Sequence, residues 1–347
     1  MNKADKLYRL LFTALSLYLI VLLLRYPSIS LEYASTGLNL WLTKMVPTLL
    51  PFMILSGIMI RMDLTESFVR LLHPLLHSLY GTSKNGSYTI IMGFLCGFPM
   101  GARIVGELYE TGRLSREEST RLLYFCNNIG PIYFLSYVVP VLVIEKPLVP
   151  FLIMYGIPLL YGLILCRIVP FFRNNTRRQP AIQHLYNAQQ NTEIHAYQSL
   201  DGGISLNAGM NSTNSIQHTT KQNKNPRMSL LAAIDTSVLS GLIGIAKLGG
   251  YMVFFNLLNI VFVPFQHTGT ALLNVYQCIL EITSGIDHSG HSLYYAILIL
   301  LPFGGFSCIA QTYSMISRTD LSVRPYIFHK VVQTALTALC YFILYIY

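Results

Sequence analysis

Charged residues are scarce in this sequence. They make up 11% of the 347 residues, whereas a soluble domain usually carries about a quarter. Hydrophobic residues account for 53% of the chain, and the mean hydropathy is +0.49. This balance excludes an ordinary soluble domain. It predicts an all-α integral membrane protein that crosses the bilayer several times.

Acidic residues are the rarer of the two charged classes. There are 15 of them against 24 Lys and Arg, so the formal net charge is +9. The basic residues lie at the ends of apolar runs and in one polar loop, and they do not gather with aromatics into a compact basic surface. Such a distribution indicates membrane topology and argues against a nucleic-acid partner.

Sequence motifs of common catalytic, metal and nucleotide sites are missing. The six cysteines stand singly in or beside apolar runs, and neither a C-x-x-C pair nor an H-E-x-x-H pattern occurs. We therefore expect no disulfide, no metal site and no enzyme. A P-loop is missing too, so any transport must use a gradient. Whether a proton or a sodium ion supplies that gradient stays open, and no other cofactor is expected.

Apolar runs are the dominant feature of what is present. Spans are expected near 8–26, 38–60, 121–144, 147–170, 231–263, 292–317 and 326–347. Two interrupted stretches, 87–112 and 270–287, are predicted to be re-entrant hairpins that enter and leave the membrane by the same face. The rival interpretation is ten ordinary spans without re-entrant segments.

The runs divide the chain into four parts. Residues 1–30 are expected to hold a retained first transmembrane helix, and residues 31–172 and 230–347 to form two repeats. The stretch between the repeats, 173–229, is polar and rich in Asn and Gln. We expect it to be a cytoplasmic loop without fixed structure.

Loop charges predict how the repeats are oriented. A count from a basic, cytoplasmic N-terminus gives the two repeats opposite orientations, each with a hairpin and a broken span. By the same count, the span 292–317 returns the chain to the cytoplasmic side, at Arg318, Arg324 and Lys330.

Short segments that contain glycine together with proline, asparagine or serine interrupt the apolar runs at four places. We call these the first to fourth breaks, at 97–101, 127–131, 281–285 and 303–307. Lipid cannot satisfy bare backbone groups, so irregular chain at membrane depth persists where it lines a cavity. In the first half the candidate substrate-binding residues are Gly97, Phe98, Pro99, Gly101, Arg103, Asn127, Asn128 and Gly130. In the second half they are Glu281, Thr283, Ser284, Gly304, Gly305, Ser307 and Gln311.

The first break predicts an anion site. A half-helix should begin near Gly101, and its unpaired N–H groups and positive dipole end attract anions. Arg103 follows and can form a bidentate contact with a carboxylate. The alternative, given equal weight, is that Arg103 extends to the cytoplasmic face.

The polar residues at the other breaks have two interpretations each. Asn127 and Asn128 either hold a polar solute, which we favour, or cap the broken helix ends. Glu281 is an intramembrane carboxylate, which by default suggests a function. It would bind a proton or Na⁺, or pair with Arg103, unless it faces water at a hairpin end.

The motif MGFLCGFPMGAR at residues 92–103 resembles the YlbJ family of sporulation integral membrane proteins, which carry nucleoside-recognition, or Gate, domains. Supporting matches are VPTLLPF at 46–52, LEITSG at 280–285 and FGGFS at 303–307. The resemblance implies a fold similar to concentrative nucleoside transporters, with two inverted repeats. It also implies a role in endospore formation, in the outer forespore membrane.

The same resemblance implies a cargo. It suggests transport of a small organic anion, dipicolinic acid, from the mother cell toward the forespore. We infer that its two carboxylates would suit Arg103 and the half-helix end, and its ring nitrogen an Asn amide. Two alternatives stay open: a nucleoside transporter of the same fold, and a scaffold that recruits spore-maturation proteins through 173–229. Expected partners are thus the lipid bilayer and a small anion, and homo-oligomerisation is left open.

Overall fold

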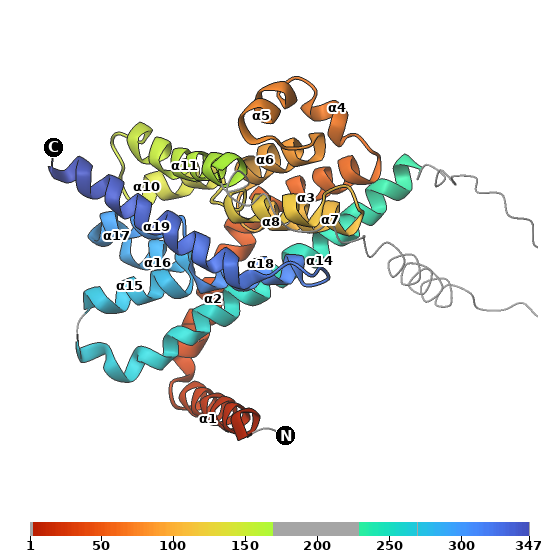
Figure 1. Ribbon diagram of the computed structural model, residues 1–347. Coiled ribbons are helices and arrows are strands. Elements are labelled where there is room, and N and C mark those ends of the chain that lie inside the picture. Colours follow the sequence, from red (N-terminus) through yellow and green to blue (C-terminus); the bar gives the residue numbers. More distant parts are fainter. Residues whose placement is uncertain (1–2, 169–228, 269, 347) are drawn as a thin grey trace, which may run out of the picture. The chain divides into compact units, whose positions relative to one another are not determined.

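The structure is a computed structural model that describes residues 3–168, 229–268 and 270–346, so the predicted loop 173–229 lies outside the described residues. Every regular element in the described part is a helix, with short π and 3-10 segments joining the α-helices (Figure 1). Six helices there are long and apolar enough to cross a bilayer. The predicted all-α, multi-pass membrane fold is confirmed.

The first half begins with a long helix and continues into shorter ones. Its elements are α1 (Lys3–Arg25), α2 (Pro27–Leu40), η1 (Trp41–Met45), α3 (Val46–Arg61), α4 (Thr65–Val69), α5 (His73–Tyr80), α6 (Lys84–Cys96), α7 (Met100–Glu110), α8 (Arg116–Phe125), α9 (Pro131–Tyr133), η2 (Phe134–Val138), α10 (Val139–Val141), α11 (Leu148–Leu163) and η3 (Ile164–Ile168). The predicted span 121–144 is divided between α8 and α9, at the break that Asn127 to Pro131 predict.

The second half follows the same order of elements. They are α14 (Leu230–Leu257), η4 (Leu258–Thr268), α15 (Thr270–Leu280), α16 (Ile282–Ser289), η5 (Gly290–Leu293), α17 (Tyr294–Leu300), α18 (Gly305–Ile316) and α19 (Val323–Ile346). Each half thus has a long helix, a helical hairpin, an interrupted helix and a closing helix.

Contacts between elements recur in the two halves. The first hairpin arm, α6, packs against both parts of the interrupted helix, α8 and α9, and α15 packs in the same way against α17 and α18. Likewise α8 contacts α11, and α17 contacts α19. The hairpin arms have 13, 11, 11 and 8 residues. A crossing helix needs roughly 20, so ten ordinary spans are not what the chain forms.

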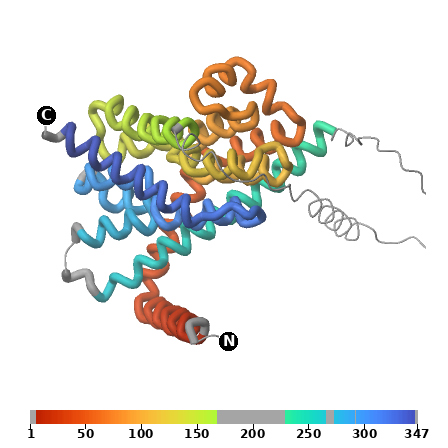
Figure 2. Tube along the Cα trace, viewed as in Figure 1, coloured from red at the N-terminus to blue at the C-terminus, as the bar shows by residue number. Residues whose placement is uncertain are grey.

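The two long helices, each 35 residues over Pro27–Arg61 and Leu230–Pro264, lie side by side and run in opposite directions (Figure 2). Near one end Gly37 lies against Met252, and toward the other Gly57 lies against Ser237. A Cβ on Gly37 would come within 3.0 Å of the Met252 carbonyl oxygen. Glycine therefore permits this close approach.

Candidate functional site

The backbone of the first break packs directly against the backbone of the second. Gly97, between α6 and α7, has a φ of +90°, and a Cβ there would lie 2.4 Å from the backbone nitrogen of Gly130. A Cβ on Gly101 would overlap the carbonyl oxygen of Cys126. Glycine at both positions lets the bare backbone of one break pack on that of the other. The half-helix expected near Gly101 begins one residue earlier, at Met100.

Asn127 ties the first half to the second. Its Oδ1 accepts from the backbone N–H of Ala102 at 3.3 Å, which satisfies one free donor at the start of α7. Its Nδ2 donates to Thr312 Oγ1 at 2.8 Å and to the Tyr326 hydroxyl at 2.9 Å. The side chain is fully buried. Asn127 therefore has the capping geometry, one of the two interpretations that the sequence allowed.

Asn128 contacts a buried lysine. Its Nδ2 donates to the carbonyl oxygen of Phe125 at 2.6 Å, and its Oδ1 accepts from Lys330 Nζ at 2.8 Å. Lys330 belongs to α19 and has no exposed surface. Lys330 is therefore enclosed by protein and is not an exposed basic residue of a loop. The loop ends before Val323, so Lys330 lies two turns inside the helix.

A periodicity in the sequence indicates this burial. Tyr326, Lys330, Gln333 and Thr337 recur at intervals of three and four, which places them on one face of α19. All four side chains are buried. A polar stripe in an otherwise apolar helix faces the protein interior rather than lipid, and this stripe was the signal that charge counting overlooked.

Glu281 is a buried carboxylate at the third break. It separates α15 from α16, is 1% exposed, and accepts the backbone N–H of Ser284 at 2.7 Å through Oε2. The Ser284 hydroxyl donates back to the Glu281 carbonyl oxygen at 3.2 Å. Glu281 thus caps the second hairpin helix. Its burial contradicts the alternative of a water-facing hairpin end.

Arg103 is buried and contacts both its own helix and α14. Its Nε pairs with Glu107 Oε1 at 3.0 Å and its Nη2 donates to Ser240 Oγ at 3.0 Å. The residue is 4% exposed, so it does not extend to the cytoplasmic face, and its carboxylate partner is Glu107 rather than Glu281. Arg103 instead joins α7 to α14.

The fourth break lies against the first. Gly304 has a φ of +72°, and a Cβ on it would approach the Phe98 ring to 3.0 Å. A Cβ on Gly305 would lie within 3.1–3.3 Å of carbonyl oxygens in the second hairpin. In the helix that follows, Gln311 lies one turn after Ser307, and its Nε2 donates to Ser307 Oγ at 3.0 Å. All four breaks therefore converge.

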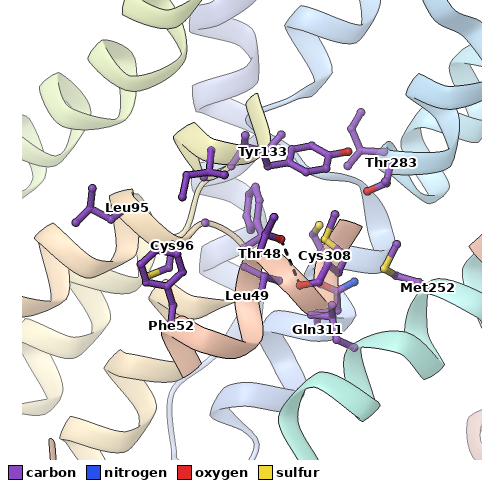
Figure 3. Close-up of a pocket in the computed structure, with 18 of the residues that line it drawn as sticks. Thr48, Leu49, Phe52, Leu95, Cys96, Tyr133, Met252, Thr283, Cys308 and Gln311 are labelled. Atoms are coloured by element: carbon purple, nitrogen blue, oxygen red, sulfur yellow. Dashed lines mark hydrogen bonds between the residues drawn. The ribbon is translucent and has the colours of Figure 1, made fainter. Parts of the chain in front are cut away.

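A cavity lies where the breaks converge (Figure 3). Six of the predicted site residues line it: Gly97, Phe98, Gly130, Glu281, Thr283 and Gln311. The other nine support these from outside the lining: Pro99, Gly101, Arg103, Asn127, Asn128, Ser284, Gly304, Gly305 and Ser307. Sequence reasoning missed further lining residues, among them Thr48, Phe52, Tyr133, Met252 and Cys308.

The polar groups of the cavity suit a small polar solute. Besides the Glu281 carboxylate, the lining offers the hydroxyls of Thr48, Tyr133 and Thr283 and the amide of Gln311. Tyr133 points its hydroxyl toward Thr283 (Figure 3), yet that buried hydroxyl has no well-aligned hydrogen-bond partner in the described part of the chain. It is a donor available to a ligand. The volume, about 50 Å³, holds only a few water molecules.

Two comparisons with known proteins gave matches, one within the first half of the chain and one along nearly its whole length. Residues 42–145, which include the first two breaks, match the family model Gate, described as nucleoside recognition. Over 95% of the chain, the sequence is 24% identical to the sporulation integral membrane protein YlbJ of Bacillus subtilis (strain 168), and the match covers 81% of that protein. No solved structure matches the chain. The resemblance seen in the sequence motifs is thereby confirmed: the chain carries a match to the Gate model and is similar along most of its length to the sporulation integral membrane protein YlbJ.

Proposed function

We propose that the protein is a secondary transporter that binds its solute in the cavity between the four breaks. The observation that carries this proposal is the convergence itself. Gly97 and Glu281 come from the two hairpins, and Gly130 and the Gly304 turn come from the two interrupted helices. Three of these residues line one cavity. Interrupted helices at corresponding places of two repeats mark the solute site in gradient-driven transporters.

We infer that the two repeats are inverted. Support comes from the antiparallel packing of Pro27–Arg61 on Leu230–Pro264, since these are the corresponding first helices of the repeats. Inverted repeats allow alternating access, because each half can rock against the other around a fixed site. The cavity volume is about 50 Å³, which is too small for a planar ring, so we expect the ring to enter only when the hairpins separate.

Dipicolinate is the solute we propose, carried from the mother cell across the outer forespore membrane. The proposal rests on the resemblance to YlbJ, a sporulation protein by name. Tyr133, Thr283 and Gln311 can donate hydrogen bonds to its carboxylates or ring nitrogen. Glu281 would repel a dianion unless it is protonated or its charge is offset nearby.

A nucleoside is the second candidate. The Gate description names nucleoside recognition. The lining itself favours it too, because it combines one carboxylate with hydroxyl and amide groups and contains neither Lys nor Arg. A neutral solute rich in hydroxyls would meet no repulsion from Glu281.

Ligand-dependent thermal unfolding of the purified protein separates these candidates. Dipicolinate should raise the melting temperature, because a ligand that binds only the folded state stabilises it. Isophthalate, which lacks the ring nitrogen, should raise it less, and uridine should have no effect. If uridine alone raised the melting temperature, the solute would be a nucleoside and not dipicolinate. A melting temperature that none of the three compounds changes would contradict both proposed solutes.

Tyr133→Phe tests whether the cavity is the site. The lost hydroxyl has no well-aligned partner among the described residues, so the fold should keep its stability while the response to dipicolinate weakens several-fold. Tyr155→Phe is the matched control. The Tyr155 hydroxyl is buried and similarly unbonded, but the residue does not line the cavity. Equal responses from the two variants would remove the cavity from the proposal.

A scaffold role would depend on residues 173–229 rather than on the cavity. Deleting this segment should leave spore dipicolinate content largely intact if the protein is a transporter. A complete loss, with normal protein abundance in the membrane, would favour the scaffold.

A further inference from the structure

The groups that surround the Lys330 ammonium are all of a kind that attracts positive charge. Lys330 Nζ donates to Asn128 Oδ1 at 2.8 Å and to Gln333 Oε1 at 3.2 Å. The faces of the Phe98 and Tyr326 rings complete the enclosure, with centroids 5.1 Å and 5.8 Å from Nζ. Amide oxygens and aromatic faces all attract positive charge.

The amide orientations are fixed by the broken helix. Asn128 Nδ2 donates to the carbonyl oxygen of Phe125 at 2.6 Å, and Gln333 Nε2 donates to that of Tyr124 at 2.7 Å. A carbonyl only accepts, so both NH₂ groups must face the backbone and both side-chain oxygens must face Lys330. These carbonyls belong to the last turn of α8, the negative end of its dipole. The cation site is therefore preorganised.

The ammonium has neutral partners. None of the carboxylates in the described residues forms an ion pair with Lys330, although the side chain has no exposed surface. A buried charge without a counter-charge is costly and uncommon inside a membrane, where it usually has a function. Phe98, whose ring contacts Lys330, also lines the solute cavity. The ammonium thus lies one side-chain layer from the solute.

We propose that Lys330 is the resident cation of the site, occupying with its ammonium group the place that a coupling sodium ion would take at the C-terminus of the half-helix α8. Half-helix C-termini are where coupling cations bind in transporters with broken helices. Because this cation is covalently attached, solute binding needs no sodium. The Lys330 ammonium group lies behind the Phe98 ring, which lines the cavity, so it places positive charge near an anionic solute. The inference rests on the proposed function for the identity of the solute.

Thermal unfolding in matched salts tests this inference. Wild-type protein should unfold at the same temperature in sodium chloride and in choline chloride, and dipicolinate should stabilise it equally in both. Lys330→Ala removes the ammonium group and leaves Asn128 Oδ1 and Gln333 Oε1 without their cation. Sodium chloride should raise its melting temperature by several degrees over choline chloride, since sodium then binds only the folded state.

Two control variants make the comparison specific. Lys330→Met fills the same space without charge, so sodium should not stabilise it. Lys247→Ala removes an exposed lysine from α14 and should behave as wild type. A merely structural role for Lys330 would lower all melting temperatures without any preference for sodium.

The outcomes separate this inference from the proposed function. A wild-type protein that requires sodium for stabilisation by dipicolinate overturns the role of Lys330, and so does a folded Lys330→Ala protein that is indifferent to sodium. If Lys330→Ala does not fold, the wild-type comparison decides alone. Failure of dipicolinate to stabilise wild type in either salt contradicts the proposed solute, while sodium stabilisation of Lys330→Ala would still support the resident cation.

Discussion

At the scale of residues, the proposed function depends on a few side chains placed against bare backbone. Glu281 caps a helix and lines the cavity at once, whereas Asn127 caps from outside the lining. Both are polar residues in apolar runs, so the sequence identified both as candidates. It could not rank them, because capping and solute binding need the same donors and acceptors.

Gly97→Ala tests how tightly the first two breaks pack. A Cβ would lie 2.4 Å from the Gly130 nitrogen, and the φ of +90° is strained for alanine. We expect a loss of roughly 1–3 kcal/mol in stability, measured by thermal unfolding in detergent. Gly156→Ala, in helix α11 with nothing within 4 Å of its added Cβ, should be neutral or slightly stabilising. A neutral Gly97→Ala would show that the breaks do not touch.

Glu281→Gln separates the charge of this side chain from its capping role. Glutamine keeps an acceptor for the Ser284 N–H, so the protein should fold. Without the only carboxyl group that the described residues contribute to the cavity lining, the pH dependence of dipicolinate binding should flatten. The measurement is the binding constant across pH, with Asp287→Asn, an exposed neighbour on α16, as the control. An unchanged pH profile would exclude Glu281 as the titrating group.

At the scale of elements, the hairpins and interrupted helices were predictable because glycine and proline act locally. Pro99 and Pro131 each stand at a helix start, where a missing N–H is tolerated. Element boundaries therefore follow from single positions. The partners of these elements do not, since α7 contacts α18 across about half of the chain.

A polar link joins two such distant elements. The Tyr109 hydroxyl of α7 donates to Asp320 Oδ1 at 2.7 Å, and Arg116 Nε of α8 pairs with Asp320 Oδ2 at 2.7 Å. Partial burial raises the pKa of Asp320, but the hydrogen bonds from Tyr109 and Arg116 outweigh it, so the pKa lies below its ordinary value. Asp320 lies in the loop before α19, outside the spans.

This link should stabilise the protein above acidic pH. A carboxyl whose folded pKa is depressed contributes stability above its unfolded pKa, and that contribution disappears as pH falls through the folded pKa. Asp320→Asn should therefore lower the melting temperature slightly at neutral pH, and the difference should vanish in acid. Asp320 is partly exposed, so the effect is about 1 kcal/mol at most. A double-mutant cycle with Tyr109→Phe should show coupling, and additive effects would contradict the link.

At the scale of the whole molecule, two halves with the same order of elements meet around one cavity. If the repeats are inverted, the first hairpin ends near Arg113 on one side of the membrane and the second ends near His288 on the other side. We expect a membrane-impermeant thiol reagent to label Arg113→Cys from the cytoplasmic side and His288→Cys from the opposite side.

The native cysteines provide the background for that experiment. Four of the six are buried and two are partly buried, so labelling of the unmodified protein should be weak. Labelling of both new cysteines from the same side would contradict the inverted arrangement.

The sequence alone determined the membrane class, the helical fold and the position of the four breaks. These properties depend on composition, on run length and on the local effects of Gly97, Pro131 and their counterparts. Only the tertiary structure decided which polar groups face the cavity. Tyr133 lines it, Arg103 turns to Glu107, and Lys330 is enclosed by Asn128 and Gln333. The reason is physical: these contacts join segments up to about two hundred residues apart, and the packing of the two halves against each other sets which face of each helix points inward.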